Sequence, residues 1–425
     1  MAVFQREMLP NGLRLLSAPM PQVQSVACFI MLSAGSRYET AETSGIAHFA
    51  EHMFFKGTEN RPTAQMIGNE LDGIGAEFNA FTGKEYTGYY VKCAAEHRGR
   101  AFDVLVDMLR NSKFDPEEIE REKGVIVEEM NMYFDTPRDY IGGVYHQLLY
   151  GDTPLGWDII GRKETVRDAT RETFLDYVNR WYTAPKMVVG IAGNFDEGVR
   201  REVEELLGEV EAEDAGGPPL AATNGDGNGS QVHIHTKESD QAHIAMGVPS
   251  YALSHPDRYA LQLLGTVLGT GMSSRLFTEV RERRGLAYYV FATNHSYTDT
   301  GTLYSQAGVD INRIDEAVET IARELKKIAA EPVPADELEK SKNVAKGRFV
   351  LATESPHGMI MFGLRREVLE GEVEEPADVL AGIDAVTIED VQRVAQDVIG
   401  KNGLKLALIG PFDDAERFEK ILLAG

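Results

Sequence analysis

The sequence predicts an α+β protein made of two homologous halves, because segments recur at a fixed offset and strand patterns alternate with helix patterns. Segments 189–196 and 406–413 both run from apolar residues through a glycine to a Phe-Asp pair. Thr170 and Thr387 each open a helical stretch at the same offset of 217 residues. Residues 135–137 likewise match residues 354–356 at an offset of 219. Self-similarity of this kind indicates a duplicated fold.

Each half mixes the two kinds of element. Residues 231–237 alternate in polarity and predict a strand, whereas apolar residues recur at helical spacing through 315–328. A stretch rich in Gly, Pro and Asn lies between the halves and is typical of a flexible linker. We therefore expect an N-terminal half at 1–212, a linker at 213–230 and a C-terminal half at 231–425.

A possible metal site lies in the run from His48 through Glu51 to His52. On a helix, imidazoles four residues apart share one face, and Glu51 lies close to the same stripe. The order inverts the commoner His-Glu-x-x-His motif and is typical of inverted zincins. We expect Ser44 to cap this helix and the apolar flanks to bury it. A plain surface helix is disfavoured, since buried imidazoles need partners.

A third ligand is expected from the acidic helix predicted at 116–130, which Asp115 caps ahead of a proline. Glu122 and Glu129 lie two turns apart on one face, so one can bind the metal while the other supports a ligand. Glu128 is a rival ligand beside Glu129. Apolar neighbours of Glu129 argue against a fully solvated acidic face.

Composition excludes several classes of function. The formal charge of −24 argues against nucleic acid or an anionic membrane as a partner. It suits cationic peptides or a surface kept acidic for solubility. No apolar run is long enough for a transmembrane helix, and the N-terminal residues show no secretory signal pattern, so we expect a cytoplasmic protein. Cys28 and Cys93 are too few for a disulfide framework.

Taken together, the motif and its surroundings resemble the pitrilysin/insulinase family of zinc metallopeptidases, in particular its mitochondrial processing peptidase-like branch. The similarity extends over essentially the whole chain and includes these segments: 11–14, 35–39, 45–47, 56–58, 79–82 and 120–126. The resemblance implies two α/β halves of the LuxS and processing peptidase type that form a clam-like cleft.

The resemblance also implies roles for residues of the first half. His48, His52 and Glu129 would bind Zn²⁺. Glu51 would be the general base, and Glu122 would be the supporting carboxylate. The resemblance further implies that Asn79, Ala80 and Phe81 form an edge strand. This strand would pair with the substrate backbone. An ordinary strand, with Asn79 capping a bend, is the alternative.

The C-terminal half is expected to lack the metal. The segment that corresponds to the His48 helix falls near 258–262 and has no histidine, and Arg348 stands opposite Glu129. The resemblance implies that Arg281 and Tyr288 grip the substrate, with Tyr288 bonding the oxyanion. Their spacing alone favours a surface arginine and a packed strand tyrosine, and only the family resemblance favours the substrate-binding interpretation.

These expectations describe a zinc-dependent endopeptidase that hydrolyses peptides or unfolded protein segments in a closing chamber. A homodimer is expected, or a heterodimer with a related chain. The alternative is a subunit of the same family that is non-catalytic or that completes its site with a partner.

Overall fold

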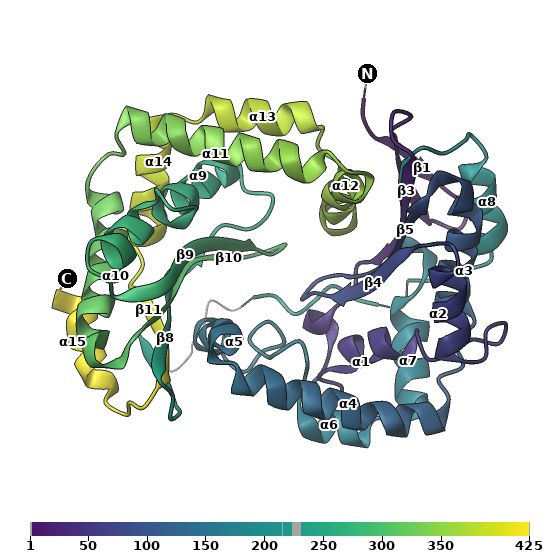
Figure 1. The fold of residues 1–425 in the computed structure, drawn as a ribbon, viewed down its shortest axis with the longest axis horizontal. Helices are drawn as coiled ribbons and strands as arrows, with labels where there is room; N and C mark the ends of the chain where they lie inside the picture. Colours follow the sequence, from purple (N-terminus) through teal and green to yellow (C-terminus); the bar gives the residue numbers. More distant parts are fainter. Residues whose placement is uncertain (1, 215, 223–230, 425) are drawn as a thin grey trace. The chain divides into compact units, whose positions relative to one another are not determined.

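The computed structural model describes residues 2–214, 216–222 and 231–424, and it confirms the α+β fold class. The chain divides into two compact units (Figure 1). The first comprises Met1–Met130, Asp158–Leu220 and Phe349–Pro376, and the second comprises Asn131–Trp157, Ala221–Arg348 and Ala377–Gly425. No helix in the described part of the chain has both the length and the apolar character needed to cross a membrane.

The first unit is built on a six-stranded sheet. Its strand order is β1 (Gln5–Met8), β2 (Arg14–Pro19), β6 (Met187–Gly193), β3 (Ser25–Leu32), β5 (Thr87–Ala94) and β4 (Glu77–Thr82). β2 and β6 are parallel, and the other neighbours are antiparallel. β3 and β6 are almost continuously apolar because helices cover both faces of the sheet there. β4 forms one edge.

Helices α3 and α12 cover opposite faces of this sheet (Figure 1). The helices of this part of the chain are α1 (Ile46–Met53), α2 (Ala64–Asp72), α3 (Arg98–Arg110), α4 (Pro116–Asp135), α6 (Lys163–Asp168), α7 (Arg171–Trp181), α8 (Val199–Leu207) and α12 (Pro356–Glu370). Short 3-10 turns span Ser36–Tyr38, Ala95–His97 and Ala184–Lys186.

Of the two residues predicted to cap the start of a helix, Asp115 and Ser44, the structure confirms only Asp115. Asp115 does cap α4, since its Oδ1 accepts a hydrogen bond from the Glu117 N–H at 2.9 Å. The prediction of Ser44 as the cap of α1 was wrong. Gly45 occupies that position with φ of 94°, a conformation that favours glycine. The Glu39 carboxylate instead accepts hydrogen bonds from the N–H groups of Gly45 and Ala47, both at 2.8 Å.

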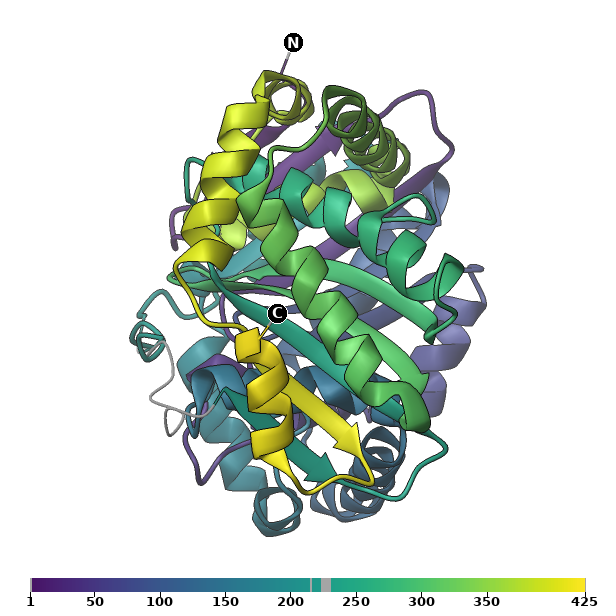
Figure 2. The same cartoon turned by 90° about the vertical axis from the view of Figure 1, so that its left-hand side faces the viewer.

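The second unit contains a five-stranded sheet. Its order is β7 (Val232–Thr236), β11 (Lys405–Gly410), β8 (Gln241–Ser250), β10 (Gly301–Asp310) and β9 (Ala287–Ser296), with only β7 and β11 parallel. Its helices are α5 (Pro137–Tyr150), α9 (Arg258–Gly269), α10 (Ile314–Ala330), α11 (Ala335–Thr353), α13 (Pro376–Ala385), α14 (Ile388–Ala395) and α15 (Ala415–Ala424). π-helical segments span Phe277–Glu282 and Gln396–Gly400, and a 3-10 turn spans Ile311–Arg313. Figure 2 shows α10 in green and α15 in yellow across one face of this sheet. The predicted strand 231–237 and helix 315–328 correspond to β7 and α10.

Each half of the sequence contributes one helix to the sheet formed mainly by the other half. α5 packs on β11 and β8 of the second sheet, and α12 packs on β6 and β3 of the first. These helices are the two that follow the repeated segments at 135–137 and 354–356. On β6, a Cβ atom at Gly190 would lie 2.4 Å from Leu364 Cδ1, so glycine lets α12 approach closely. Segments of the two compact units therefore alternate along the chain. The predicted division into an N-terminal half at 1–212, a linker at 213–230 and a C-terminal half at 231–425 stays a prediction. Part of the predicted linker lies outside the described residues.

We expect Leu364→Ala to lower the free energy of unfolding of the first unit by about 2–5 kcal/mol, because Leu364 is fully buried against the sheet. Urea unfolding monitored by Trp181 fluorescence, in a Trp157→Phe background, measures this change. Arg365→Ala alters an exposed residue of the same helix and should change stability by less than about 0.5 kcal/mol. Equal unfolding midpoints for the two variants would contradict the packing of α12 on this sheet.

Candidate metal centre

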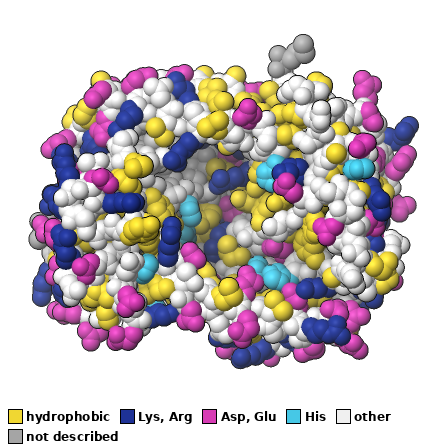
Figure 3. Space-filling view, in the orientation of Figure 1, with side chains coloured by type: hydrophobic (Ala, Val, Ile, Leu, Met, Phe, Trp, Pro, Cys, Tyr) yellow, Lys and Arg dark blue, Asp and Glu magenta, His cyan; other side chains and the backbone are white. Residues whose placement is uncertain are grey.

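Helix α1 presents its polar residues on one face because the other face is buried. Its buried residues are Ile46, Ala47, Phe49, Ala50 and Met53. The side chains of His48 and His52 remain 13% and 23% exposed. Their ring centroids are 4.7 Å apart. Figure 3 shows histidine side chains at the surface over α1. The expectation of a largely buried helix is therefore confirmed, with its imidazoles accessible on one side.

Glu129 of α4 meets both imidazoles. Its Oε1 lies 3.6 Å from Nε2 of His48, and its Oε2 lies 3.5 Å from Nε2 of His52. In a tetrahedral zinc site with bonds near 2.1 Å, ligand atoms stand about 3.4 Å apart. The three side chains therefore fit one zinc ion with little movement. In the part of the chain that the structure describes, this is the one group of three His, Cys, Asp or Glu side chains that converges in this way.

The electrostatic surroundings keep His48 neutral. Burial, and then the nearby His52, lower the pKa of His48 to about 4. A neutral imidazole has a free lone pair on one ring nitrogen, which is the form that binds a metal. His48 Nδ1 is buried and has no protein partner among the described residues.

Glu122 holds the other side of His52. Its Oε1 lies 2.8 Å from Nδ1 of His52, and Lys56 Nζ lies 2.5 Å from its Oε2. Burial disfavours the charged carboxylate, but the hydrogen bonds from His52 and Lys56 outweigh burial and lower the pKa of Glu122. When Nδ1 of His52 donates its proton to Glu122, the other ring nitrogen, Nε2, faces Glu129. This arrangement matches the carboxylate–histidine pairs that orient metal ligands. The sequence did not point to Lys56.

The two neighbouring glutamates differ in their surroundings. Glu128 is exposed and lies outside the converging group. Glu51 is half-buried, and burial raises its pKa above the ordinary value. The hydroxyl of Thr82 and the charge of His52 act in the opposite direction, whereas Glu129 adds to the rise. Thr82 Oγ1 donates to Glu51 Oε2 at 2.5 Å, a contact that sequence analysis missed.

The predicted substrate strand is β4, which pairs with β5 and has no second neighbour among the described strands. Asn79 is exposed, Ala80 is buried and Phe81 is partly buried. Asn79 Oδ1 accepts a hydrogen bond from the Ala80 N–H at 2.9 Å, so this side chain also contacts its own strand. β4 is therefore an edge strand, as expected, and its role in substrate binding stays a prediction.

Arg281 and Tyr288 lie together in the second unit. The Arg281 guanidinium carbon is 5.4 Å from the centroid of the Tyr288 ring and 4.8 Å from that of Phe277. Tyr288 is 73% exposed, so it is not the packed strand tyrosine of the alternative interpretation. The first residues of α9, which correspond to the His48 helix, carry no metal-binding side chains. The second unit therefore offers a cationic and phenolic surface pair.

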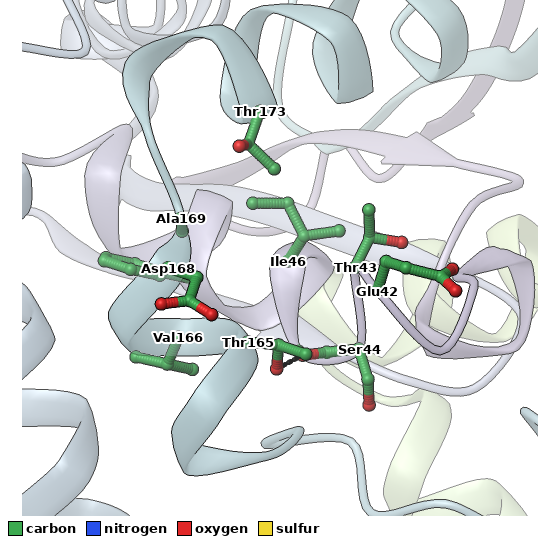
Figure 4. Close-up of a pocket in the computed structure, with 11 residues that line it drawn as sticks. Glu42, Thr43, Ser44, Ile46, Thr165, Val166, Asp168, Ala169 and Thr173 are labelled. Carbon is green, nitrogen blue, oxygen red and sulfur yellow. Dashed lines mark hydrogen bonds between the residues drawn. The ribbon is translucent and has the colours of Figure 1, made fainter.

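A small cavity lies at the N-terminal end of α1, and Figure 4 shows its lining. Its volume is about 50 Å³, which suits a few water molecules and is far too small for a peptide. Two of its lining residues are joined by a hydrogen bond from the Thr165 hydroxyl to the Ser44 carbonyl. The cavity is lined by one end of α1 and does not include either histidine.

Comparison with known proteins agrees with this geometry. Residues 14–163 match the family model described as insulinase (peptidase family M16), and residues 168–345 match the model described as peptidase M16 inactive domain. Several bacterial relatives carry the name zinc protease. The Bacillus subtilis protein YmxG is 36% identical over 96% of this chain and 98% of its own length. The Streptomyces coelicolor protein SCO5738 is 34% identical over 97% of this chain and 90% of its own length.

Solved structures share the fold. A protease from Helicobacter pylori has a TM-score of 0.90 at 21% identity, covering 97% of this chain and all of that one. A Pseudomonas fluorescens protein described as a peptidase M16 inactive domain has a TM-score of 0.88 at 16% identity, covering 96% and 98%. The matched family models, the near full-length relatives and the convergence of His48, His52 and Glu129 agree: this chain belongs to the insulinase family, peptidase family M16.

Proposed function

We propose that this protein is a zinc-dependent endopeptidase that hydrolyses peptides or unfolded protein segments in a closing chamber. The observation that carries the proposal is the convergence of His48, His52 and Glu129 at separations that suit one zinc ion. The names of the relatives support zinc as the metal. Membership of the processing peptidase-like branch, a cytoplasmic location and a homodimer are further parts of the proposal.

Glu51 is the proposed general base. Zinc bound to these three side chains would supply Lewis-acid activation of water and of the scissile carbonyl. Glu51 accepts the proton from the attacking water and delivers it to the leaving amine, and a carboxylate with a raised pKa suits both transfers. The free edge of β4 would align the substrate backbone through main-chain hydrogen bonds. Tyr288 and Arg281 would bind the carbonyl oxygen of the substrate as negative charge develops there.

The alternative is a subunit that is non-catalytic or that needs a related partner chain. The match of residues 168–345 to an inactive domain favours a half that has no metal chemistry of its own. The complete set of three ligands and Glu51 in one chain favours a self-sufficient enzyme. Cleavage of a peptide library by the purified chain alone separates these alternatives. Activity that a chelator abolishes and one equivalent of zinc restores would support the enzyme, and a zinc-loaded chain that cleaves nothing would exclude it.

We expect Glu129→Gln to weaken zinc binding at least about tenfold, because a neutral amide replaces a charged ligand. Glu128→Gln removes the same charge one residue away and should leave zinc affinity within about twofold of the parent. Competition with a chromophoric chelator measures both affinities. The ligand assignment would be reversed if Glu128→Gln lost zinc while Glu129→Gln kept it.

We expect Glu51→Gln to retain one zinc ion per chain and to lower kcat about a hundredfold or more, because the amide cannot accept the proton. Elemental analysis of the purified variant gives the zinc content, and cleavage of a fluorogenic peptide gives kcat. Hydrolysis at the parental rate would show that Glu51 is not the base.

A further inference from the structure

We propose that Thr82 is a positioning residue for Glu51 and that it couples the base to strand β4. Its hydroxyl would hold one carboxylate oxygen so that the other faces the attacking water. This inference rests on the proposed peptidase function and adds a residue that neither the motif nor the converging metal ligands include.

The contact itself is specific. Thr82 Oγ1 donates to Glu51 Oε2 at 2.5 Å, and Thr82 is the one side chain that hydrogen-bonds Glu51 among the described residues. The bond occupies Oε2 and leaves Oε1 free. A glutamate has three side-chain torsions, and without this bond its carboxylate can turn toward other rotamers. A carboxylate held in the correct orientation transfers a proton faster than one that moves between rotamers.

The face of β4 that carries Thr82 is directed at α1. Successive side chains alternate between the two faces of a strand, so Phe78, Ala80 and Thr82 share one face, whereas Asn79 and Phe81 share the other. The Phe78 ring stacks on Phe55, two residues after the end of α1, with the ring centroids 6.3 Å apart. β4 is therefore held against the α1 region at both of its ends, by an apolar contact and by the Thr82 bond.

The turn that follows Thr82 is anchored in the protein interior. Residues 35–39 lie along it, and the N–H groups of Ser36 and Arg37 donate to the Gly83 and Lys84 carbonyls at 3.1 and 2.8 Å. The Arg37 guanidinium also pairs with the Glu85 carboxylate at 2.7 Å, and both side chains are at most 2% exposed. A Cβ at residue 35 would lie 2.4 Å from the Gly83 oxygen, so glycine is required for this approach. Thr82 is thus the last strand residue before a rigidly held turn.

The same segment also fixes α1. Glu39 lies two residues after Arg37 and accepts hydrogen bonds from the N–H groups of Gly45 and Ala47 at the start of that helix. One short segment therefore holds the turn beyond Thr82 and the helix that carries Glu51. The distance between the hydroxyl and the carboxylate is preset by buried contacts, which distinguishes it from a chance surface hydrogen bond.

The arrangement joins the base to the strand proposed to bind substrate. Residues 79–81 form the free edge, and Thr82 is the next residue along β4. A peptide that pairs with this edge would restrict the motion of β4 and hence that of Thr82. Loss of the Thr82 hydroxyl should therefore lower kcat while leaving KM nearly unchanged, because the hydroxyl contacts Glu51 and the substrate pairs with the backbone.

The test compares Thr82→Val, which keeps the side-chain shape, with Thr82→Ser, which keeps the hydroxyl. We expect Thr82→Val to lower kcat about tenfold to a hundredfold, with KM within about twofold, and Thr82→Ser to stay within about threefold of the parental kcat. Zinc content should be unchanged in both. The matched control is Thr302→Val on β10, whose hydroxyl donates to the Val248 carbonyl at 2.9 Å. That variant should lose stability and keep kcat.

A double-mutant cycle tests whether Thr82 acts through Glu51. In a Glu51→Gln background, the further change Thr82→Val should lower the residual activity by no more than about twofold. A loss as large as that in the parental background would overturn the inference, because Thr82 would then act through another group.

A structural readout separates this inference from the proposed function. In crystal structures of zinc-free protein, Glu51 should hold the parental rotamer in Thr82→Ser and should rotate or occupy several rotamers in Thr82→Val. An unchanged, ordered Glu51 in Thr82→Val would overturn the positioning role even if the parent cleaves peptides. A parent that binds zinc and cleaves no peptide would refute the proposed function, and the crystallographic comparison would still decide the role of Thr82.

Discussion

The candidate centre depends on the meeting of α1 and α4, because neither helix holds three metal-binding atoms by itself. α1 contributes two imidazoles, and burial of the His48 ring, followed by the nearby His52, lowers the pKa of His48 so that this ring stays neutral. α4 contributes Glu129 to one side of these rings and Glu122 to the other nitrogen of His52. The charge of Glu129 then complements a divalent cation, which two imidazoles alone would bind more weakly.

The two homologous units differ in that only the first contains the candidate metal ligands among the described residues. Both sheets are mixed, and each is covered by a helix from the opposite half of the sequence, α12 on the first and α5 on the second. This exchange makes each unit depend on both halves for its core. The second unit retains the helix that corresponds to α1, but buried apolar residues fill α9. The first unit therefore carries the candidate metal ligands on helices beside its edge strand, whereas the second unit carries Arg281 and Tyr288.

Residues 35–39 give the first unit a common anchor for its helix and its hairpin. The Glu39 carboxylate accepts hydrogen bonds from backbone N–H groups at the start of α1, and the buried Arg37–Glu85 ion pair holds the turn after β4. A buried ion pair is weak evidence for stability, but its hydrogen bond restricts the geometry of the two side chains that form it. Here that geometry places an edge strand and a candidate base in hydrogen-bonding contact.

The sequence by itself determined the fold class, the duplication and the pairing of His48 with His52, because helical periodicity and repeated segments are local properties. It placed Glu122 and Glu129 on one face of a helix, and the family resemblance then suggested their roles. Only the tertiary structure decided which carboxylate reaches Nε2 and which reaches Nδ1, since that depends on how α4 lies against α1. It also placed Gly45 at the cap position of α1, with Glu39 as the acceptor for the first N–H groups of that helix. It packed α5 and α12 each on the sheet formed mainly by the other half of the sequence, and it brought Thr82 to Glu51 from 31 residues away. These contacts join distant segments, and no spacing along the chain encodes them.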